Sequence, residues 1–135
     1  MRIVKIKETC LYVGDLDRTE VFYTQVLGAE FVARQPGRHV FFRLGETMLL
    51  CFIAATTRAE PGQSAHGATG SQHVAFEIPA DEYEPWKVRL SAAGVAILHE
   101  TDWKPGVRSF YFHDPDGHLL ELIQPGLWEA FPHDR

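Results

Sequence analysis

The chain has 135 residues, of which 45% are hydrophobic, and it carries a formal net charge of −5. This length fits one domain, or two small modules that share a core. Lysine and arginine never cluster in more than two neighbours, which argues against a nucleic-acid surface, and no apolar run approaches the roughly 20 residues of a membrane span. Two cysteines are too few for a disulfide framework, and no signal peptide is evident. We therefore expect a reducing, cytoplasmic setting.

The first half of the chain predicts one strand, one helix and three further strands. Residues 3–13 have the composition of a strand. The helix that follows is expected to begin with Asp17 as its N-cap, since Glu20 lies at capping-box spacing, and to end before Gly28. The three strands that follow are expected at residues 30–34, 39–44 and 48–53.

The same pattern then restarts after a polar segment. Residues 54–70 contain little large apolar material and are interpreted as a linker or long loop. A strand is expected at 72–78, and a helix capped by Asp81 should end at Gly94. Strands at 95–99, 108–113 and 119–123 complete the second half, with a longer loop at residues 100–107.

Glu121 lies inside the last predicted strand and is a residue that requires an explanation. Residues 109–113 and 119–123 form a hairpin in outline, and Asp114-Pro-Asp-Gly117 has the composition of its turn. Leu119, Glu121 and Ile123 share one face because side chains alternate along a strand. A carboxylate among apolar neighbours is costly unless it is paired or binds a cation.

The element order β-α-β-β-β therefore occurs twice, as an internal repeat of about 60 residues, which predicts an α+β fold. We place the first module at residues 4–54, the linker at 55–70, the second module at 71–125 and a tail at 126–135. The repeat aligns Glu8 with His73. It also superposes Leu49-Leu-Cys-Phe52 on Leu119-Leu-Glu-Leu122, which aligns Cys51 with Glu121.

Several motifs show a resemblance to a known family. They are Leu11-Tyr-Val-Gly-Asp-Leu16, His73-Val-Ala-Phe76 and Phe112-His-Asp-Pro-Asp-Gly117 with Leu120-Glu-Leu122. The chain resembles the vicinal oxygen chelate superfamily, which includes glyoxalase I, fosfomycin-resistance thiol transferases, extradiol dioxygenases and bleomycin-binding proteins. The resemblance implies two paired modules in a cup-shaped mixed sheet, commonly assembled as a homodimer.

Metal-binding members of that family take ligands from four strand positions, which here correspond to Glu8, Cys51, His73 and Glu121. The resemblance thus implies a divalent metal (Zn, Ni, Mn, Co or Fe) held by Glu8, His73 and Glu121. Cys51 departs from the family pattern and is expected to line the substrate site as a small apolar residue. Tyr111 matches a tyrosine that contacts substrate beside the metal in the thiol transferases, and no clear counterpart exists for the basic residues that those enzymes use.

Each candidate also has a purely structural interpretation. Glu121 could be a buried carboxylate bonded to arginine or backbone, and His73 a satisfied core histidine. Glu8 could be a solvated residue at the end of a strand. Arg108 could either clamp a substrate anion or be a surface charge.

These observations predict a metal-dependent, glyoxalase-like lyase, isomerase or transferase that acts on a small oxygen-chelating substrate. A thiol such as glutathione is a possible partner, and neither a nucleic acid nor a membrane is expected. Glu8 or Glu121 would act as the base, and Tyr111, Cys51 and Arg108 would contact the substrate. The competing hypothesis is a binding protein that sequesters an antibiotic-like ligand without chemistry, as the bleomycin-resistance proteins do.

Overall fold

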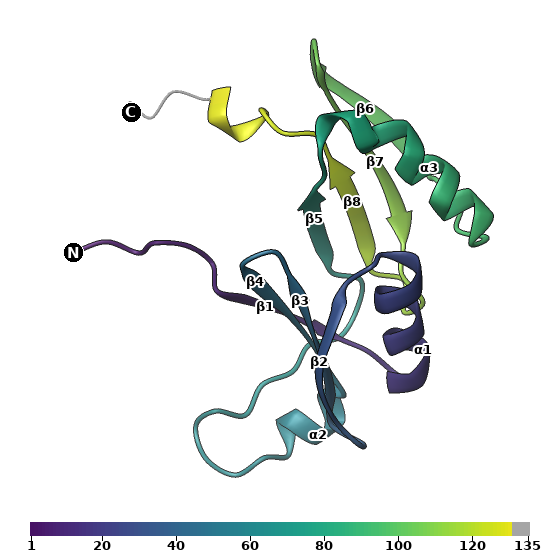
Figure 1. Cartoon of the computed structure of the whole chain (residues 1–135). Coiled ribbons are helices and arrows are strands. Elements are labelled where there is room, and N and C mark those ends of the chain that lie inside the picture. Colours follow the sequence, from purple (N-terminus) through teal and green to yellow (C-terminus); the bar gives the residue numbers. More distant parts are fainter. Residues whose placement is uncertain (131–135) are drawn as a thin grey trace. The chain divides into compact units, whose positions relative to one another are not determined.

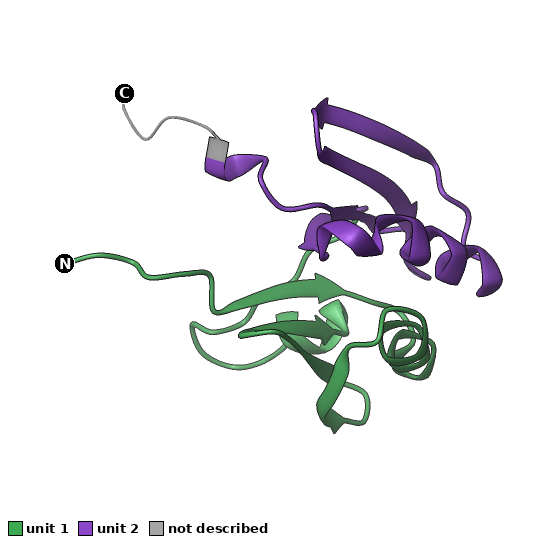
Figure 2. Cartoon of the chain, turned by 45° about the horizontal axis from the view of Figure 1, so that its top comes forward, with its two compact units in different colours: residues 1–70 green, residues 71–135 purple. Residues whose placement is uncertain are grey.

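The structure is a computed structural model that describes residues 1–130, and it divides into two compact units (Figures 1 and 2). Unit 1 comprises residues 1–70 and unit 2 begins at residue 71. Each unit contains one four-stranded mixed sheet, in which the strands of the unit lie in the order first, fourth, third, second. The repeated α+β architecture that the sequence predicts is therefore confirmed. No helix among the described residues is long and apolar enough to span a membrane.

The elements of unit 1 follow the predicted order, with one addition. They are β1 (Glu8–Tyr12), α1 (Leu16–Val21), a π-helical turn (Phe22–Val26), β2 (Glu30–Gln35), β3 (His39–Leu44), β4 (Thr47–Phe52) and α2 (Ala54–Arg58). The prediction of a linker over the whole of residues 54–70 is thus wrong at its start. The short helix α2 forms there, and it buries the side chain of Thr57 completely.

Two details of the predicted first helix are wrong. Its N-cap is Asp15, whose carboxylate accepts the backbone N–H of Arg18 at 3.0 Å, and not Asp17. The helix begins earlier than predicted because Leu16 is already buried in its first turn. The Asp17 carboxylate instead accepts a hydrogen bond from Arg34 of β2 at 2.6 Å. The predicted end is confirmed, since Gly28 follows the helical segment with a φ of 72°, a conformation that favours glycine.

The elements of unit 2 repeat this order. They are β5 (His73–Glu77), a 3₁₀ turn (Ala80–Glu82), α3 (Tyr83–Ala92), β6 (His99–Lys104), β7 (Val107–His113), β8 (Leu119–Ile123) and a second 3₁₀ turn (Trp128–Ala130). The prediction that Asp81 is the N-cap of this helix is therefore wrong. Asp81 lies within the 3₁₀ turn, and no side chain caps α3.

The strand predicted at residues 95–99 and the loop at residues 100–107 are also wrong. After α3, the N–H of Val95 returns to the carbonyl of Leu90 at 2.9 Å, so this segment closes the helix and does not extend the sheet. The strand starts at His99 instead. A turn at residues 105–106 then joins it to β7 as an antiparallel hairpin.

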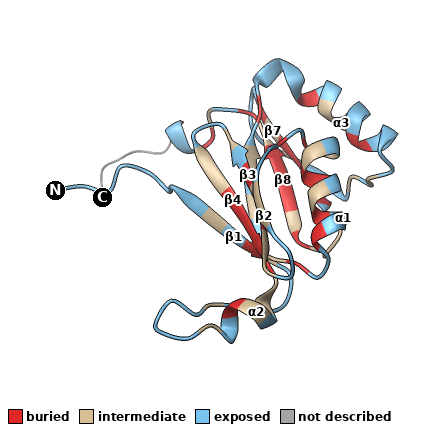
Figure 3. Cartoon of the chain, turned by 60° about the horizontal axis from the view of Figure 1, so that its bottom comes forward, coloured by how far each residue is buried: buried red, intermediate tan, exposed pale blue. Residues whose placement is uncertain are grey.

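The core of each unit lies between one face of its sheet and its helix. Figure 3 shows the buried residues concentrated on the strands β4, β7 and β8 and on the inner side of α1. In unit 1 the ring of Tyr23 lies 5.4 Å from that of Phe42 of β3, and both residues are fully buried. In unit 2 Tyr83 packs edge-on against Phe110 of β7 at 5.3 Å. The other face of each sheet, which we call its open face, carries Glu8 in unit 1 and His73, Tyr111 and Glu121 in unit 2.

Candidate functional site

His73 and Glu121 lie together on the open face of the sheet in unit 2. Strand β5 pairs with β8 in parallel, with His73 opposite Leu119 and Ala75 opposite Glu121. The Nε2 atom of His73 lies 3.4 Å from a carboxylate oxygen of Glu121. The Glu121 side chain is only 6% exposed, whereas that of His73 is 48% exposed. The imidazole therefore lies between a buried carboxylate and the surface of the unit.

A backbone hydrogen bond fixes the tautomer of His73. Its Nδ1 atom lies 2.8 Å from the carbonyl oxygen of Leu119. Because a carbonyl only accepts, Nδ1 carries a proton, and in the neutral imidazole Nε2 carries the lone pair. That lone pair faces the Glu121 carboxylate. The imidazole nitrogen and the carboxylate oxygen are both acceptors, so at this separation they repel unless a proton or a cation lies between them. In histidine–carboxylate metal sites the ion takes that place, and a carbonyl commonly accepts the other N–H of the histidine, as Leu119 does here.

Tyr111 borders this pair on the same face. It lies directly opposite Glu121 in the β7–β8 ladder, and its ring stacks beside that of His73 with centroids 6.1 Å apart. Burial, followed by the negative charge of Glu121, raises the pKa of the Tyr111 phenol. Tyr111 therefore remains a hydrogen-bond donor throughout the neutral range.

His99 is a site neighbour that the sequence reasoning missed. Its ring stacks on that of Tyr111 at 4.3 Å with an interplanar angle of 15°. The register of the β6–β7 hairpin places the two residues opposite each other. The turn dipeptide Pro105-Gly106 signals the hairpin, but counting from it would bring Glu100 level with Tyr111. A bulge between Asp102 and Lys104 shifts the register by one residue and places His99 there instead.

The predicted equivalence of Cys51 and Glu121 is wrong by one residue. In unit 2 Glu121 pairs with Tyr111 and Ala75, while in unit 1 the residue with the same pairing is Leu50. A shift of one residue moves a side chain to the other face of a sheet. Cys51 lies opposite Val40 on the face that packs against the helix, where it is fully buried. The prediction that Cys51 lines a substrate site is corrected accordingly.

Arg108 also lies on the face away from the His73–Glu121 pair. Its guanidinium stacks over the ring of Tyr83 at 4.0 Å and contacts the Glu84 carboxylate of α3 at 3.4 Å. Alternation along β7 gives Tyr111 the open face and Arg108 the helix-bearing face. The structure therefore does not support Arg108 as a clamp for a substrate anion.

Unit 1 presents Glu8 and an aromatic cluster on its open face. Glu8 begins β1 and is exposed. Farther along the sheet Phe52 packs against the rings of four neighbours. These rings belong to Tyr12, His39, Phe41 and His66. The segment after α2 is tied to this cluster, since the Tyr12 hydroxyl and His66 Nδ1 are hydrogen-bonded at 2.6 Å.

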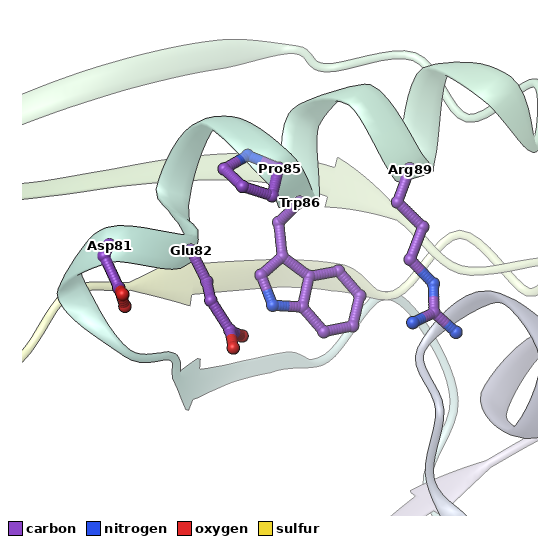
Figure 4. Close-up of a pocket in the computed structure, with 5 residues that line it drawn as sticks. All are labelled: Asp81, Glu82, Pro85, Trp86 and Arg89. Carbon is purple, nitrogen blue, oxygen red and sulfur yellow. The ribbon is translucent and has the colours of Figure 1, made fainter.

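Among residues 1–130 no three side chains of histidine, cysteine, aspartate or glutamate form a group able to hold a metal. Within unit 2 the candidate ligands are the pair His73 and Glu121. A surface pocket lies beside α3, where the guanidinium of Arg89 stacks over the Trp86 ring at 4.9 Å. Figure 4 shows its lining by Asp81, Glu82, Pro85, Trp86 and Arg89, and none of these is a predicted site residue.

The fold and the open-face pair define a protein of the glyoxalase class, and comparison with known proteins agrees. The sequence model described as Glyoxalase/Bleomycin resistance protein/Dioxygenase superfamily matches residues 5–122. The chain belongs to this superfamily.

Three relatives, one curated and two solved, match the chain over most of their own length. A glutathione transferase FosA of Serratia marcescens is 34% identical over 113 residues, covering 83% of this chain and 74% of that protein. A solved lactoylglutathione lyase from Agrobacterium tumefaciens has a TM-score of 0.89 and 36% identity, over 97% of this chain and 100% of that one. A variant of the fosfomycin resistance protein FosX from Listeria monocytogenes, complexed with Mn(II) and 1S,2S-dihydroxypropylphosphonic acid, has a TM-score of 0.71 and 26% identity, covering 97% and 98%.

Proposed function

We propose that the chain is a metal-dependent, glyoxalase-like enzyme that acts on a small substrate with neighbouring oxygen atoms. The observation that carries this proposal is the His73–Glu121 pair, with an Nε2 lone pair turned toward a buried carboxylate oxygen 3.4 Å away. One imidazole and carboxylate oxygens suit a divalent ion such as Mn²⁺, Fe²⁺, Co²⁺, Ni²⁺ or Zn²⁺. The Mn(II) complex of the FosX variant supports the same assignment.

Glu8 is the proposed third ligand, contributed by unit 1 of this chain or of a second copy. It occupies the position in β1 that His73 occupies in β5, and its carboxylate is exposed. Three protein ligands leave coordination positions for the substrate. A homodimer is the assembly that we expect, and a monomer mass by light scattering at micromolar concentration would count against it.

The residues around the pair have distinct roles in this proposal. A bound divalent ion supplies Lewis-acid polarisation of substrate oxygens. His73 is held by Leu119 for ligation, and Tyr111 presents a protonated hydroxyl that donates a hydrogen bond to a substrate oxygen. Glu8 and Glu121 are the two candidate bases among the predicted site residues. The position equivalent to Glu121 in unit 1 is Leu50, which cannot transfer protons.

This arrangement favours a group transfer, or the attack of a nucleophile on a polarised electrophile, over the isomerisation of a hemithioacetal. Isomerisation requires a base that removes one proton and returns it, whereas attack of a thiol or water on a polarised electrophile does not. The FosA relative carries the name glutathione transferase, so glutathione or a similar thiol is a reasonable co-substrate. We also expect the protein to work in the cytoplasm.

Metal content tests the proposal directly. Protein purified without a chelating column should contain about one divalent ion per chain by elemental analysis, and Glu121→Gln should lose it. Glu77→Gln is the matched control, because Glu77 lies on the open face of the same strand as His73 and is exposed. The alternative is a protonated His73 that forms an ion pair with Glu121 and binds no metal. Metal-free wild-type protein that fails to take up Mn²⁺, Zn²⁺, Ni²⁺ or Co²⁺ in calorimetric titrations would contradict the proposal.

A further inference from the structure

The turn between β7 and β8 is built around the carboxylate of Asp114. This carboxylate accepts the backbone N–H groups of Asp116 and His118, both at 2.9 Å. The N–H of Asp114 in turn reaches the carbonyl of His118 at 3.0 Å, and that of Gly117 reaches the carbonyl of Asp114 at 3.0 Å. These four hydrogen bonds, two to the Asp114 carboxylate and two between backbone groups, fix the conformation of the turn and the point at which the His118 side chain leaves it.

From that point the side chain of His118 reaches Gln72, the residue before strand β5. Its Nδ1 atom lies 3.0 Å from the backbone nitrogen of Gln72 and accepts that N–H. His118 is only 2% exposed. Because Nδ1 accepts, the neutral ring carries its proton on Nε2.

This contact lies one residue before His73. The carbonyl of Gln72 accepts the N–H of Leu119 at 2.8 Å, and the carbonyl of Leu119 accepts Nδ1–H of His73 at 2.8 Å. Both backbone groups of Gln72 are thus bonded to the 118–119 segment. Among the described residues of unit 2, β5 pairs only with β8, so these bonds help to fix the point at which β5 begins, at His73.

The first module provides an internal comparison that lacks the hydrogen bond corresponding to the one between His118 and Gln72. There the N–H of Met48 donates to the carbonyl of Lys7 at 3.0 Å, as Leu119 does to Gln72. The residue that corresponds to His118 is Thr47, whose hydroxyl donates to the Leu44 carbonyl of its own turn at 3.1 Å. The strand that follows Lys7 begins with Glu8, whereas the strand that follows the clamped Gln72 begins with an imidazole that needs a fixed tautomer.

We propose that His118 is a positioning residue for His73, acting through Gln72 to hold the His73 imidazole with its Nδ1 on Leu119 and its Nε2 toward Glu121. This inference rests on the proposed metal site for its consequence in binding. It does not require a metal for the geometry itself. His118 is proposed to act through Gln72 and not as a ligand, so its effect should appear in the affinity for metal and in the state of His73.

A pair of amide substitutions separates the two ring nitrogens. His118→Asn places an oxygen close to the position of Nδ1 and can still accept from Gln72, whereas His118→Gln reaches toward the position of Nε2 and cannot. We expect His118→Gln to weaken Mn²⁺ binding by about tenfold, at the lower end for residues that support a ligand. His118→Asn should stay within about threefold of the wild type. Thr47→Val, at the corresponding place in the other module, should leave Mn²⁺ affinity unchanged.

Metal-free protein supplies an independent measurement. Amide hydrogen exchange should show the Gln72 N–H protected in the wild type and in His118→Asn, and faster in His118→Gln. Long-range ¹H–¹⁵N spectra should show His73 as the Nδ1–H tautomer in the first two proteins and as a mixture in the third. Equal exchange rates and an unchanged tautomer in His118→Gln would overturn the inference. If wild-type protein binds no Mn²⁺, the proposed function fails, and the tautomer of His73 still decides the role of His118.

Discussion

Leu50 of β4 and Glu121 of β8 occupy equivalent positions in the two modules. Each lies opposite an aromatic residue of the preceding antiparallel strand, Phe41 for Leu50 and Tyr111 for Glu121. One open face therefore offers an aliphatic side chain where the other offers a carboxylate. The repeat is symmetric in its backbone and asymmetric in its chemistry.

This equivalence predicts that the two neighbouring residues of β4 respond differently to a carboxylate. Cys51→Glu places a charge in the core of unit 1 and should cost about 3 kcal/mol or more of folding stability. Leu50→Glu places it on the open face that carries Glu8, so the loss should be smaller. Urea unfolding of both variants measures the difference. Equal destabilisation would contradict the register of β4.

The candidate ligands predict a graded loss of metal binding. His73→Ala and Glu121→Ala should each lower Mn²⁺ affinity by at least tenfold, because each removes a ligand. Cys51→Ala should change it far less, since the Cys51 side chain is buried on the helix-bearing face of its own sheet, away from Glu8. Calorimetric titration of the three variants provides the comparison. A loss with Cys51→Ala as large as with Glu121→Ala would show that the assigned ligands are wrong.

The absence of a carboxylate at Leu50 predicts poor glyoxalase I activity. Turnover of the methylglyoxal–glutathione hemithioacetal should be weak or absent with Ni²⁺, Co²⁺, Mn²⁺ or Zn²⁺. The expected kcat/KM lies below roughly 10⁴ M⁻¹s⁻¹, the low end for ordinary enzymes. A value above this limit would mean that Glu8 or Glu121 both binds the ion and transfers the proton. Leu50→Glu, if it folds, should then raise the rate further.

Glu100 predicts an acid-sensitive contribution to stability. A hydrogen bond from Lys87, followed by one from the hydroxyl of Tyr83, lowers the pKa of Glu100 below its ordinary value of 4.5. A lowered folded-state pKa contributes stability that is present above the unfolded value and is lost as pH falls through the folded value. The wild type should therefore be more stable than Glu100→Gln near neutral pH.

The measurement is a series of urea midpoints for the wild type and Glu100→Gln from neutral pH downwards. Their difference should shrink below about pH 4.5, since protonation of Glu100 removes its charge in the wild type. The difference should be small because the Glu100 side chain is 46% exposed and screened by solvent. Lowering the pH should not widen it.

The sequence alone determined most of the backbone. Short apolar runs bounded by turn residues predicted β3 and β8 with the observed bounds, because such runs are typical of strands packed in a core. The turn residues Asp114-Pro-Asp-Gly117 predicted the hairpin, because their preferences are local. Glu121 was also identified from local sequence, because a carboxylate stands out in an otherwise apolar strand.

Tertiary structure decided which side chains share a face and what they contact. Counting along the sequence aligned Cys51 with Glu121, but a helix or loop can absorb one residue, and only the ladders with β1 and β3 fix Leu50 in that place. Likewise, no local signal tells that Arg108 stacks on Tyr83 or that His118 reaches Gln72. These contacts join residues far apart in the chain. They depend on strand register and hairpin closure, which the packing of the whole module sets.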